Sequence, residues 1–191
     1  MNKDAMLQQL VSTGIYLVTE DAGPSERRLQ AVSDALAGGA RVVQLRDKHT
    51  PKRQLLEEAR AMKALCHERD AVFIVNDDVA LAWASDADGV HVGQDDLPVE
   101  DARKLLGEGK LIGLSISTLE QAIEAVRLGA DYIGVGAIYP TLTKPDKTAR
   151  GVELLKSVRA EVEKPLVAIG GIDETNAAEV FAAGADSIAV V

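Results

Sequence analysis

The chain has 191 residues, of which 47% are hydrophobic and 27% charged, and its formal net charge is −9. These proportions are typical of a soluble globular protein, and we expect one domain over residues 1–191. The negative charge disfavours binding to nucleic acid or to an anionic membrane, because phosphate backbones select basic faces. The single cysteine, Cys66, excludes an intrachain disulfide and lies on an apolar helical stripe. No stretch has the length of a membrane span or the pattern of a secretion signal, so we expect a cytoplasmic protein.

Short apolar runs recur along the chain about every 25 residues and alternate with amphipathic helical patterns. The runs predict strands over residues 15–19, 42–45, 72–75, 89–92, 111–114, 132–135, 165–169 and 186–191. Helices are predicted between them: from Ser25 to near Gly38, after Pro51, around 81–83, from Leu97-Pro98 to near Gly107, over 119–126, over 151–160, and from an N-cap at Asp173 to Gly184.

This alternation predicts a parallel α/β fold, and eight units predict a (β/α)₈ TIM barrel. A recurring join supports the repetition: Gly39-Ala40-Arg41, Gly129-Ala130-Asp131 and Gly184-Ala185-Asp186. An open doubly wound sheet is the competing fold, but no Gly-x-Gly-x-x-Gly follows the first strand. As printed, the chain stops on the eighth predicted strand, so we expect the eighth helix to be missing from it and the natural product to be longer.

Carboxylates follow two neighbouring strands at the point where each leaves the core. Asn76 and Asp77 follow one apolar run, and Asp96 follows the next. Because parallel strands end at the same edge, these side chains are expected to converge there. Two carboxylates suit Mg²⁺, which completes its shell with water and substrate phosphates. The alternative is that Asp77 and Asp96 only cap the helices that follow them.

Other strand ends supply groups that bind anions. The cationic and polar side chains are Gln44, Arg46, Lys48, Ser115, Thr141, Thr143 and Lys144, and Gly170-Gly171 offers exposed backbone N–H groups. Arg46, Lys48 and Lys144, together with a metal, suit a pyrophosphate. The two threonines and the glycine amides suit a single phosphate on a second molecule.

The histidines are weaker candidates. His49 and His67 are expected at the surface, and His91, inside a predicted strand, is expected to be packed and hydrogen-bonded, with a catalytic role as the alternative. No Ser-His-Asp triad and no zinc-type Cys/His spacing occurs.

The motifs at the strand ends resemble those of the thiamine phosphate synthase family. The resemblance covers the chain from the first strand to the last residue, and its motifs are Tyr16-Leu17-Val18-Thr19, Gln44-Leu45-Arg46-Asp47-Lys48, Asn76-Asp77-Asp78-Val79, Gly89-Val90-His91-Val92-Gly93-Gln94-Asp95-Asp96, Gly136-Ala137-Ile138-Tyr139-Pro140-Thr141-Leu142-Thr143-Lys144 and Ile169-Gly170-Gly171-Ile172. It implies a TIM-barrel enzyme that uses Mg²⁺ to join hydroxymethylpyrimidine pyrophosphate to hydroxyethylthiazole phosphate. The products are thiamine phosphate and pyrophosphate, formed by a dissociative route.

The resemblance also implies roles for individual residues. The pyrimidine pyrophosphate would contact Gln44, Leu45, Arg46, Asp47, Lys48, Asn76, Ser115 and Lys144, of which Arg46, Lys48, Ser115 and Lys144 would act in catalysis. Asp77 and Asp96 would hold Mg²⁺, and the thiazole phosphate would contact Thr141, Leu142, Thr143, Gly171 and Val191.

Two departures from the family stand out. Ala137 occupies a position where the family commonly has proline, and the family continues past Val191 with a serine that helps to hold the thiazole phosphate. Two alternative functions remain: a thiazole tautomerase-like paralogue and a non-catalytic phosphate-binding barrel. The paralogue would not need the pyrophosphate and metal groups. The expected partners are small phosphorylated molecules, and the oligomeric state is left open, a homo-oligomer included.

Overall fold

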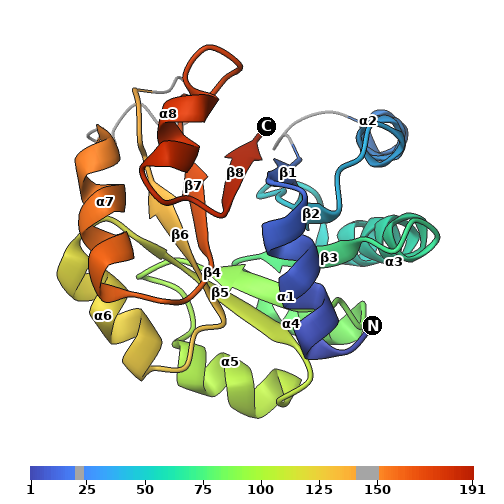
Figure 1. Cartoon of the computed structure of the whole chain (residues 1–191). Coiled ribbons are helices and arrows are strands. Elements are labelled where there is room, and N and C mark those ends of the chain that lie inside the picture. Colours follow the sequence, from blue (N-terminus) through green and yellow to red (C-terminus); the bar gives the residue numbers. More distant parts are fainter. Residues whose placement is uncertain (20–23, 141–150) are drawn as a thin grey trace.

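The computed structural model describes residues 1–19, 24–140 and 151–191. Within these residues the strands form a closed parallel barrel in which each strand pairs with the next and the last pairs with the first (Figure 1). The strands are β1 (Ile15–Val18), β2 (Val42–Leu45), β3 (Val72–Asn76), β4 (Gly89–Val92), β5 (Leu111–Ile116), β6 (Tyr132–Gly136), β7 (Leu166–Ile169) and β8 (Ser187–Val190). The predicted (β/α)₈ barrel is confirmed.

The helices are α1 (Lys3–Ser12), α2 (Ser25–Ala37), α3 (Lys52–His67), α4 (Val79–Ala84), α5 (Val99–Leu106), α6 (Leu119–Arg127), α7 (Gly151–Glu161) and α8 (Ala177–Ala182). The helices from α2 onward surround the barrel on the outside (Figure 1). From α2 onward each helix connects two consecutive strands, whereas α1 precedes the first strand. None of the helices in the described ranges is both long enough and apolar enough to span a bilayer.

Strand residues alternate between two apolar cores, and this alternation decides which side chains enter the barrel. In β3, Phe73 and Val75 pack against the surrounding helices, while Val72 and Ile74 belong to the cluster inside the barrel. Successive side chains of a strand point to opposite faces. By this alternation Asn76, at the carboxyl end of β3, shares the inward face.

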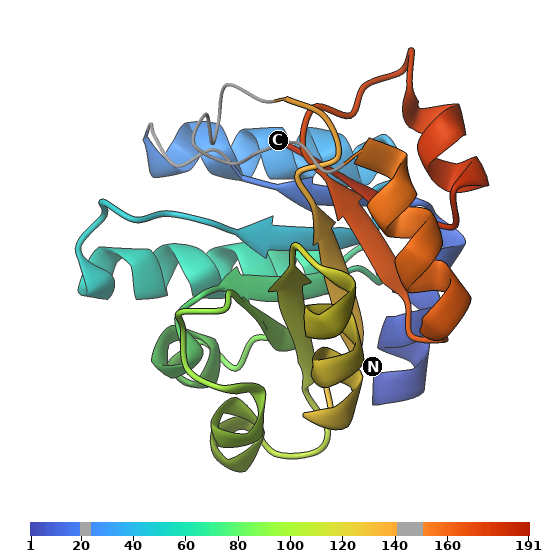
Figure 2. The same ribbon diagram turned by 90° about the vertical axis from the view of Figure 1, so that its left-hand side faces the viewer.

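The helix α1 was not predicted. Asn2 caps it by accepting a hydrogen bond from the Ala5 N–H at 2.9 Å, and Met6 and Leu10 are buried in the cluster inside the barrel. The Ser187 hydroxyl donates to the Leu10 carbonyl, which ties this helix to the start of β8. The two ends of the chain lie at opposite ends of the barrel (Figure 2), so α1 covers the amino end and leaves the carboxyl end to the site.

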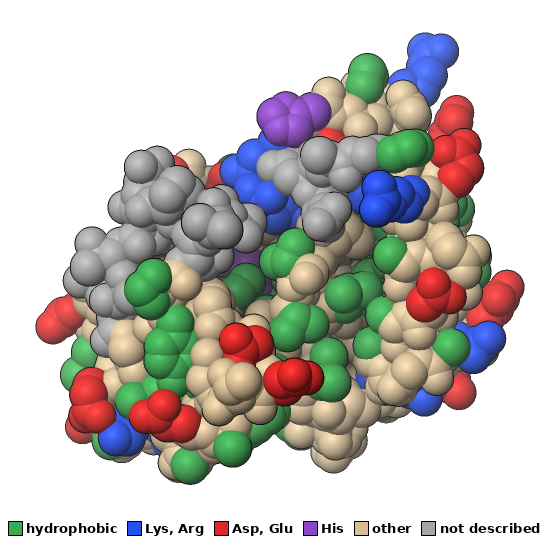
Figure 3. Space-filling view, turned by 90° about the horizontal axis from the view of Figure 1, so that it is seen from above, with side chains coloured by type: hydrophobic (Ala, Val, Ile, Leu, Met, Phe, Trp, Pro, Cys, Tyr) green, Lys and Arg blue, Asp and Glu red, His purple; other side chains and the backbone are tan. Residues whose placement is uncertain are grey.

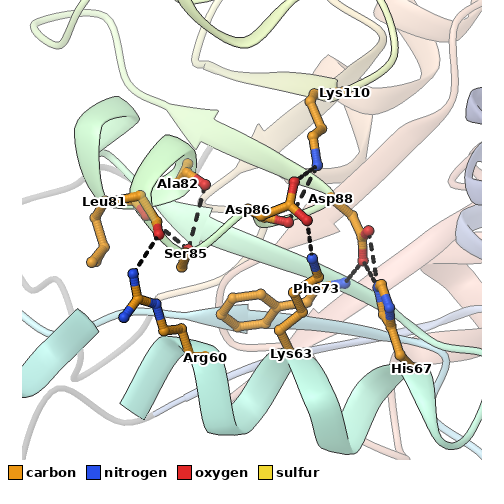
Figure 4. Close-up of polar contacts among 11 residues, drawn as sticks. Arg60, Lys63, His67, Phe73, Leu81, Ala82, Ser85, Asp86, Asp88 and Lys110 are labelled. Carbon is orange, nitrogen blue, oxygen red and sulfur yellow. Dashed lines mark hydrogen bonds and ion pairs between the residues drawn. The ribbon is translucent and has the colours of Figure 1, made fainter. Parts of the chain in front are cut away.

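At the amino end of the barrel, an aspartate just before β4, β6 and β8 forms two hydrogen bonds with the backbone of one residue of a preceding strand, and we call this arrangement a clip. Figure 4 shows the first case: the Asp88 carboxylate accepts the Phe73 N–H at 2.8 Å, and His67 lies 3.0 Å from the same carboxylate. The Asp88 N–H in turn donates to the Phe73 carbonyl at 2.9 Å.

The same reciprocal pair of hydrogen bonds joins Asp131 to Ile112 and Asp186 to Leu166. Arg103 and Arg159 supply the cations there, at 2.5 and 3.1 Å. The Gly-Ala-Asp joins of the sequence are therefore structural clips at the amino end.

The prediction that Asp173 caps the last helix is wrong. The helix α8 begins at Ala177, and its N-cap is Asn176. The Asp173 carboxylate instead accepts hydrogen bonds from the N–H and the hydroxyl of Thr175, at 2.8 and 2.6 Å. It closes a local turn before the helix, which is a common alternative use of an aspartate side chain.

Candidate active site

Asp77 and Asp96 meet at the carboxyl end of the barrel. Asp77 follows β3 with a φ of 61°, and its N–H donates to the His91 carbonyl at 2.8 Å, which holds this turn beside β4. The Asp96 carboxylate accepts the Gly93 N–H at 2.7 Å. Burial, and then the neighbouring Asp77 carboxylate, raise the pKa of Asp96 above its usual value of 3.8. The sequence prediction that these acids converge agrees with this geometry.

Neither acid serves as a helix cap. The carboxylate that caps α4 belongs to Asp78, which accepts the Leu81 N–H at 2.8 Å. The N-cap residue of α5 is Pro98, without a side-chain cap, so Asp96 lies before that helix. The capping alternative is therefore wrong for both Asp77 and Asp96.

The two carboxylates fit a Mg²⁺ ion held jointly by protein and substrate. Within the described residues no group of three or more His, Cys, Asp or Glu side chains could enclose a metal. Mg²⁺ needs only one or two carboxylates when water and phosphate complete its octahedral shell. A cation between Asp77 and Asp96 would offset both the burial of the Asp96 carboxylate, which is the largest cause of its raised pKa, and the repulsion from Asp77. The Mg²⁺ assignment itself remains a prediction.

Cationic side chains accompany this acidic pair. The Lys48 ammonium lies 3.4 Å from the Asp77 carboxylate, and 53% of its side chain is exposed. Arg46 is held at the end of β2 by its backbone, because its N–H donates to the Thr19 hydroxyl at 3.0 Å. That hydroxyl donates to the Arg46 carbonyl at 3.2 Å. Figure 3, which views the molecule from above, shows one group of Lys and Arg side chains in the upper half of that face.

The Asp47 carboxylate is engaged by its own loop and by Arg28. It accepts the N–H groups of His49 and Thr50 at 2.8 and 2.7 Å and lies 2.7 Å from Arg28 of α2. Burial opposes the ionised form, but the hydrogen bonds from Thr50 and His49 and the Arg28 charge outweigh it and lower the pKa of Asp47. Arg28 also pairs with the buried Glu58 at 2.6 Å. Asp47 therefore shapes the loop that presents Arg46 and Lys48.

The Leu45 side chain is buried among the helices outside the barrel. Of the predicted run 44–48, the side chains of Leu45 and Asp47 are engaged in packing and in the ion pair with Arg28. The buried Arg28 was missed. Its only sequence signal is an arginine inside an amphipathic helical pattern, which is usually a surface residue.

The inward face of the barrel carries a continuous series of hydrogen bonds. The Gln44 amide nitrogen donates to the Tyr16 hydroxyl at 2.9 Å, and that hydroxyl lies 2.9 Å from the hydroxyl of Tyr132. The Tyr132 hydroxyl is 3.1 Å from His91 Nδ1, and His91 Nε2 is 2.8 Å from the Ser115 hydroxyl. His91 is thus packed and hydrogen-bonded, as expected. Gln44 and Ser115, predicted to contact the same substrate, are the two ends of this series.

Glycines make the room for these rings. A Cβ at Gly113 would lie 2.2 Å from the Tyr132 ring and 2.4 Å from His91 Nδ1, and one at Gly134 would lie 2.9 Å from His91 Cε1. All three distances are below any ordinary contact, so the two strands need glycine at these positions. The two tyrosines were not predicted. Glycines inside strands are the signal that could have pointed to a close approach.

The predicted site for a second phosphate is described in part. Gly170 and Gly171 have φ values of 105° and 64°, which side chains rarely adopt. A Cβ at Gly171 would lie 2.6 Å from the Pro140 carbonyl, so the segment after β6 passes directly over the segment after β7. Val191 follows β8 and is 59% exposed. Thr141, Leu142, Thr143 and Lys144 lie outside the described residues.

A pocket of about 240 Å³ opens beside the acidic pair. Its polar lining is Asp47, Lys48, Lys52, Asn76, Asp77 and Asp78, and Lys52 pairs with Asp78 at 2.5 Å. Leu45, Leu55 and Leu81 form its apolar lining. The pocket joins the ends of β2 and β3, where the sequence predicted the pyrophosphate contacts.

Known proteins with similar sequences cover nearly the whole chain. Residues 15–191 match the family model described as thiamine monophosphate synthase. A thiamine-phosphate synthase of Chloroflexus aurantiacus is 50% identical over 188 residues, which are 97% of this chain and 86% of that protein. The thiamine-phosphate synthase of Methanospirillum hungatei is 47% identical over 180 residues, which are 93% of this chain and 87% of that protein.

Solved structures agree with the sequence matches. A thiamine phosphate pyrophosphorylase from Pyrococcus furiosus has a TM-score of 0.85 and 39% identity, with 95% of this chain and 86% of that chain covered. An N-acetylmannosamine-6-phosphate 2-epimerase from Clostridium perfringens has a TM-score of 0.73 at 20% identity, with 97% and 88% covered, and shows the fold alone. Because the family model matches residues 15–191, this chain belongs to the thiamine monophosphate synthase family.

Proposed function

We propose that this chain is a cytoplasmic transferase that joins hydroxymethylpyrimidine pyrophosphate to hydroxyethylthiazole phosphate and releases pyrophosphate. The observation that carries the proposal is the meeting of Asp77, Asp96 and Lys48 at the carboxyl end of a barrel of this family. The thiamine-phosphate synthases of Chloroflexus aurantiacus and Methanospirillum hungatei support the choice of substrates.

The arrangement suits a reaction that needs charge neutralisation more than acid–base chemistry. Departure of pyrophosphate leaves positive charge on a benzyl-like carbon, which the aminopyrimidine ring can delocalise. Lys48 and Arg46, at the end of β2, would bind the departing pyrophosphate, and Ser115 would donate a hydrogen bond to it. When bound by Asp77 and Asp96, Mg²⁺ would add further stabilisation of the leaving group's negative charge.

The second substrate must be held in line with the reacting carbon. Gly170 and Gly171 lie beside the segment that ends at Pro140, and we place the thiazole phosphate at their backbone N–H groups. Lys144 and Thr141–Thr143 keep the roles that the family resemblance implies. A homo-oligomer is compatible with the proposal, which does not require one.

The test is an incubation of the protein with both substrates, with and without Mg²⁺. The expected products are thiamine phosphate and pyrophosphate in equal amounts, and chelation of the metal should abolish both. Isomerisation of a thiazole phosphate without any pyrophosphate release would instead favour the tautomerase-like paralogue. Binding of both substrates without turnover would favour the non-catalytic phosphate-binding barrel.

A further inference from the structure

Five residues from five different strands form one hydrogen-bonded series across the inside of the barrel. In order they are Gln44, Tyr16, Tyr132, His91 and Ser115, with successive distances of 2.9, 2.9, 3.1 and 2.8 Å. The three inner members are outside the set that the family resemblance assigns to substrate. Tyr16 and Tyr132 are 1% and 0% exposed, so water does not reach the two tyrosines in the series.

The chemistry of the donors gives the series a direction. The Gln44 amide nitrogen can only donate, so the Tyr16 hydroxyl accepts there and points its own hydrogen at the Tyr132 oxygen. Tyr132 then directs its single hydrogen to His91 Nδ1. Burial raises the pKa of both Tyr16 and Tyr132, so each hydroxyl keeps its hydrogen at neutral pH.

The consequence for His91 is a single tautomer. A ring that accepts at Nδ1 carries its hydrogen on Nε2, which therefore donates to the Ser115 oxygen 2.8 Å away. The Ser115 hydroxyl, already accepting from His91, has its hydrogen available for a partner above the barrel. The reverse direction would require the Gln44 amide oxygen to face Tyr16.

We propose that Tyr16, Tyr132 and His91 are positioning residues that aim the Ser115 hydroxyl hydrogen at the departing pyrophosphate. The aim is set before the substrate arrives, so no reorientation is needed as negative charge grows on the leaving oxygens. A series of aligned hydrogen bonds in a low-dielectric interior also polarises its last donor. This inference rests on the proposed function for the identity of the acceptor.

The Tyr132 ring packs against the rings of Tyr16 and His91. The Tyr132 ring lies 5.3 Å from the His91 ring and 6.1 Å from the Tyr16 ring, measured between centroids. Gly113 and Gly134 leave the rings just enough space, as their missing Cβ atoms would overlap them. The rings of Tyr132 and His91 therefore depend on glycine at both positions for their placement.

The first experiment reads the tautomer directly and needs no activity. The chain has three histidines. Nitrogen-15 NMR of histidine-labelled protein should show His91 with a protonated Nε2 and a bare Nδ1, its signals being identified by their loss in His91→Gln. Tyr132→Phe should shift His91 toward a mixture of tautomers. A wild-type ring with its hydrogen on Nδ1 would overturn the proposal, because the series would then run the other way.

The second experiment separates positioning from stability by a double-mutant cycle. Tyr132→Phe and Tyr16→Phe should each lower kcat about fivefold to tenfold, the effect of about one hydrogen bond, with KM changed by less than about twofold. In a Ser115→Ala background, Tyr132→Phe should have less than about a twofold further effect. Factors that simply multiply would show that Tyr132 acts without Ser115, which contradicts the proposal.

A control is available at a buried hydroxyl outside the series. The Ser85 hydroxyl donates to the Leu81 carbonyl at 2.7 Å at the end of α4, and Ser85→Ala removes it at a distance from the series and from the proposed substrate contacts. It should leave kcat and the tautomer of His91 unchanged. If the protein does not couple the two substrates at all, the proposed function fails while the NMR result still decides the direction of the series.

Discussion

Replacing Asp96 by asparagine should raise the stability of the metal-free protein while it removes activity. The amide oxygen of asparagine can still accept the Gly93 N–H, so the turn from Gly93 to Asp96 is kept. What disappears is a partly buried negative charge that faces Asp77. A residue that weakens the fold but serves the chemistry is expected at a functional site.

The size of the stability change follows from the geometry. Two like charges about 4 Å apart repel by about 1 kcal/mol in water and by about 4 kcal/mol at a dielectric constant of about 20. Since 32% of the Asp77 side chain is exposed and Lys48 lies 3.4 Å away, we adopt the lower figure. About 1 kcal/mol corresponds to a rise in Tm of about 2–4 °C for a chain of this size.

The effect on function has the opposite sign. Loss of one of two metal ligands should lower kcat/KM by about 100-fold or more, because a metal that stabilises a leaving group contributes several kcal/mol. The assay has two parts: thermal unfolding in chelator and in excess Mg²⁺, and pyrophosphate release with both substrates. In wild-type protein, Mg²⁺ at about 100 times its Kd should add about 2.7 kcal/mol of stability.

The matched control is Asp95→Asn, which removes an exposed neighbouring charge and should change neither quantity. If Asp96→Asn lowers Tm in chelator, the repulsion argument is wrong. If Mg²⁺ stabilises Asp96→Asn as much as wild type, these acids are not the metal ligands.

The same site should make Mg²⁺ affinity depend on pH. Protons and Mg²⁺ compete for the Asp96 carboxylate, whose pKa lies above its usual 3.8. Affinity should therefore fall as the pH is lowered through that raised pKa. The unfavourable effect of the ionised Asp96 on the metal-free fold is present above this pKa and is relieved below it. Calorimetric titration with Mg²⁺ at several pH values checks the sign, and an affinity that rises as the pH falls would refute the competition.

Three further substitutions test other parts of the argument. Gly113→Ala should destabilise the fold by about 1–3 kcal/mol, because its Cβ would lie 2.2 Å from the Tyr132 ring. The control is Gly109→Ala, whose Cβ would have no atom within 4 Å and which should cost less than about 1 kcal/mol. Urea unfolding of the two variants measures both free energies. Arg28→Met should cost about 3–5 kcal/mol by leaving two buried carboxylates unpaired, and the exposed Arg27→Met should not; equal losses would sink the ion-pair account. Ser115→Ala should lower kcat more than it raises KM, and a change confined to KM would show that Ser115 binds ground and transition states equally.

Patterns that depend on neighbouring residues were predicted well from the sequence. Runs of Val and Ile placed every strand within a few residues, and the rule that parallel strands end at one edge brought Asp77 and Asp96 together. The strands β1, β7 and β8 are one or two residues shorter than predicted, and β3, β5 and β6 are one or two residues longer at their carboxyl ends. There Asn76, Ser115 and Gly136 continue the ladder, because backbone pairing does not require an apolar side chain.

Contacts between distant parts of the chain could not be predicted. Tyr16 and Tyr132 are 116 residues apart, and only closure of the barrel brings their hydroxyls together. The helix α1 was missed because only Met6 and Leu10 are buried, which is too few for an amphipathic stripe. Asp47 matched a binding motif, yet its carboxylate pairs with Arg28 of the helix α2.

The clips at the amino end bear on the order in which the barrel folds. Each clip joins residues that are close in sequence: 15 positions apart for Phe73 and Asp88, 19 for Ile112 and Asp131, and 20 for Leu166 and Asp186. Closure of the barrel instead pairs Ile15 with Ile188. Short loops close at a lower entropic cost than long ones. We therefore expect pulsed hydrogen exchange during refolding to protect the amides of Phe73, Ile112 and Leu166 before that of Ile188, which bonds to the Gly14 carbonyl only when the barrel closes.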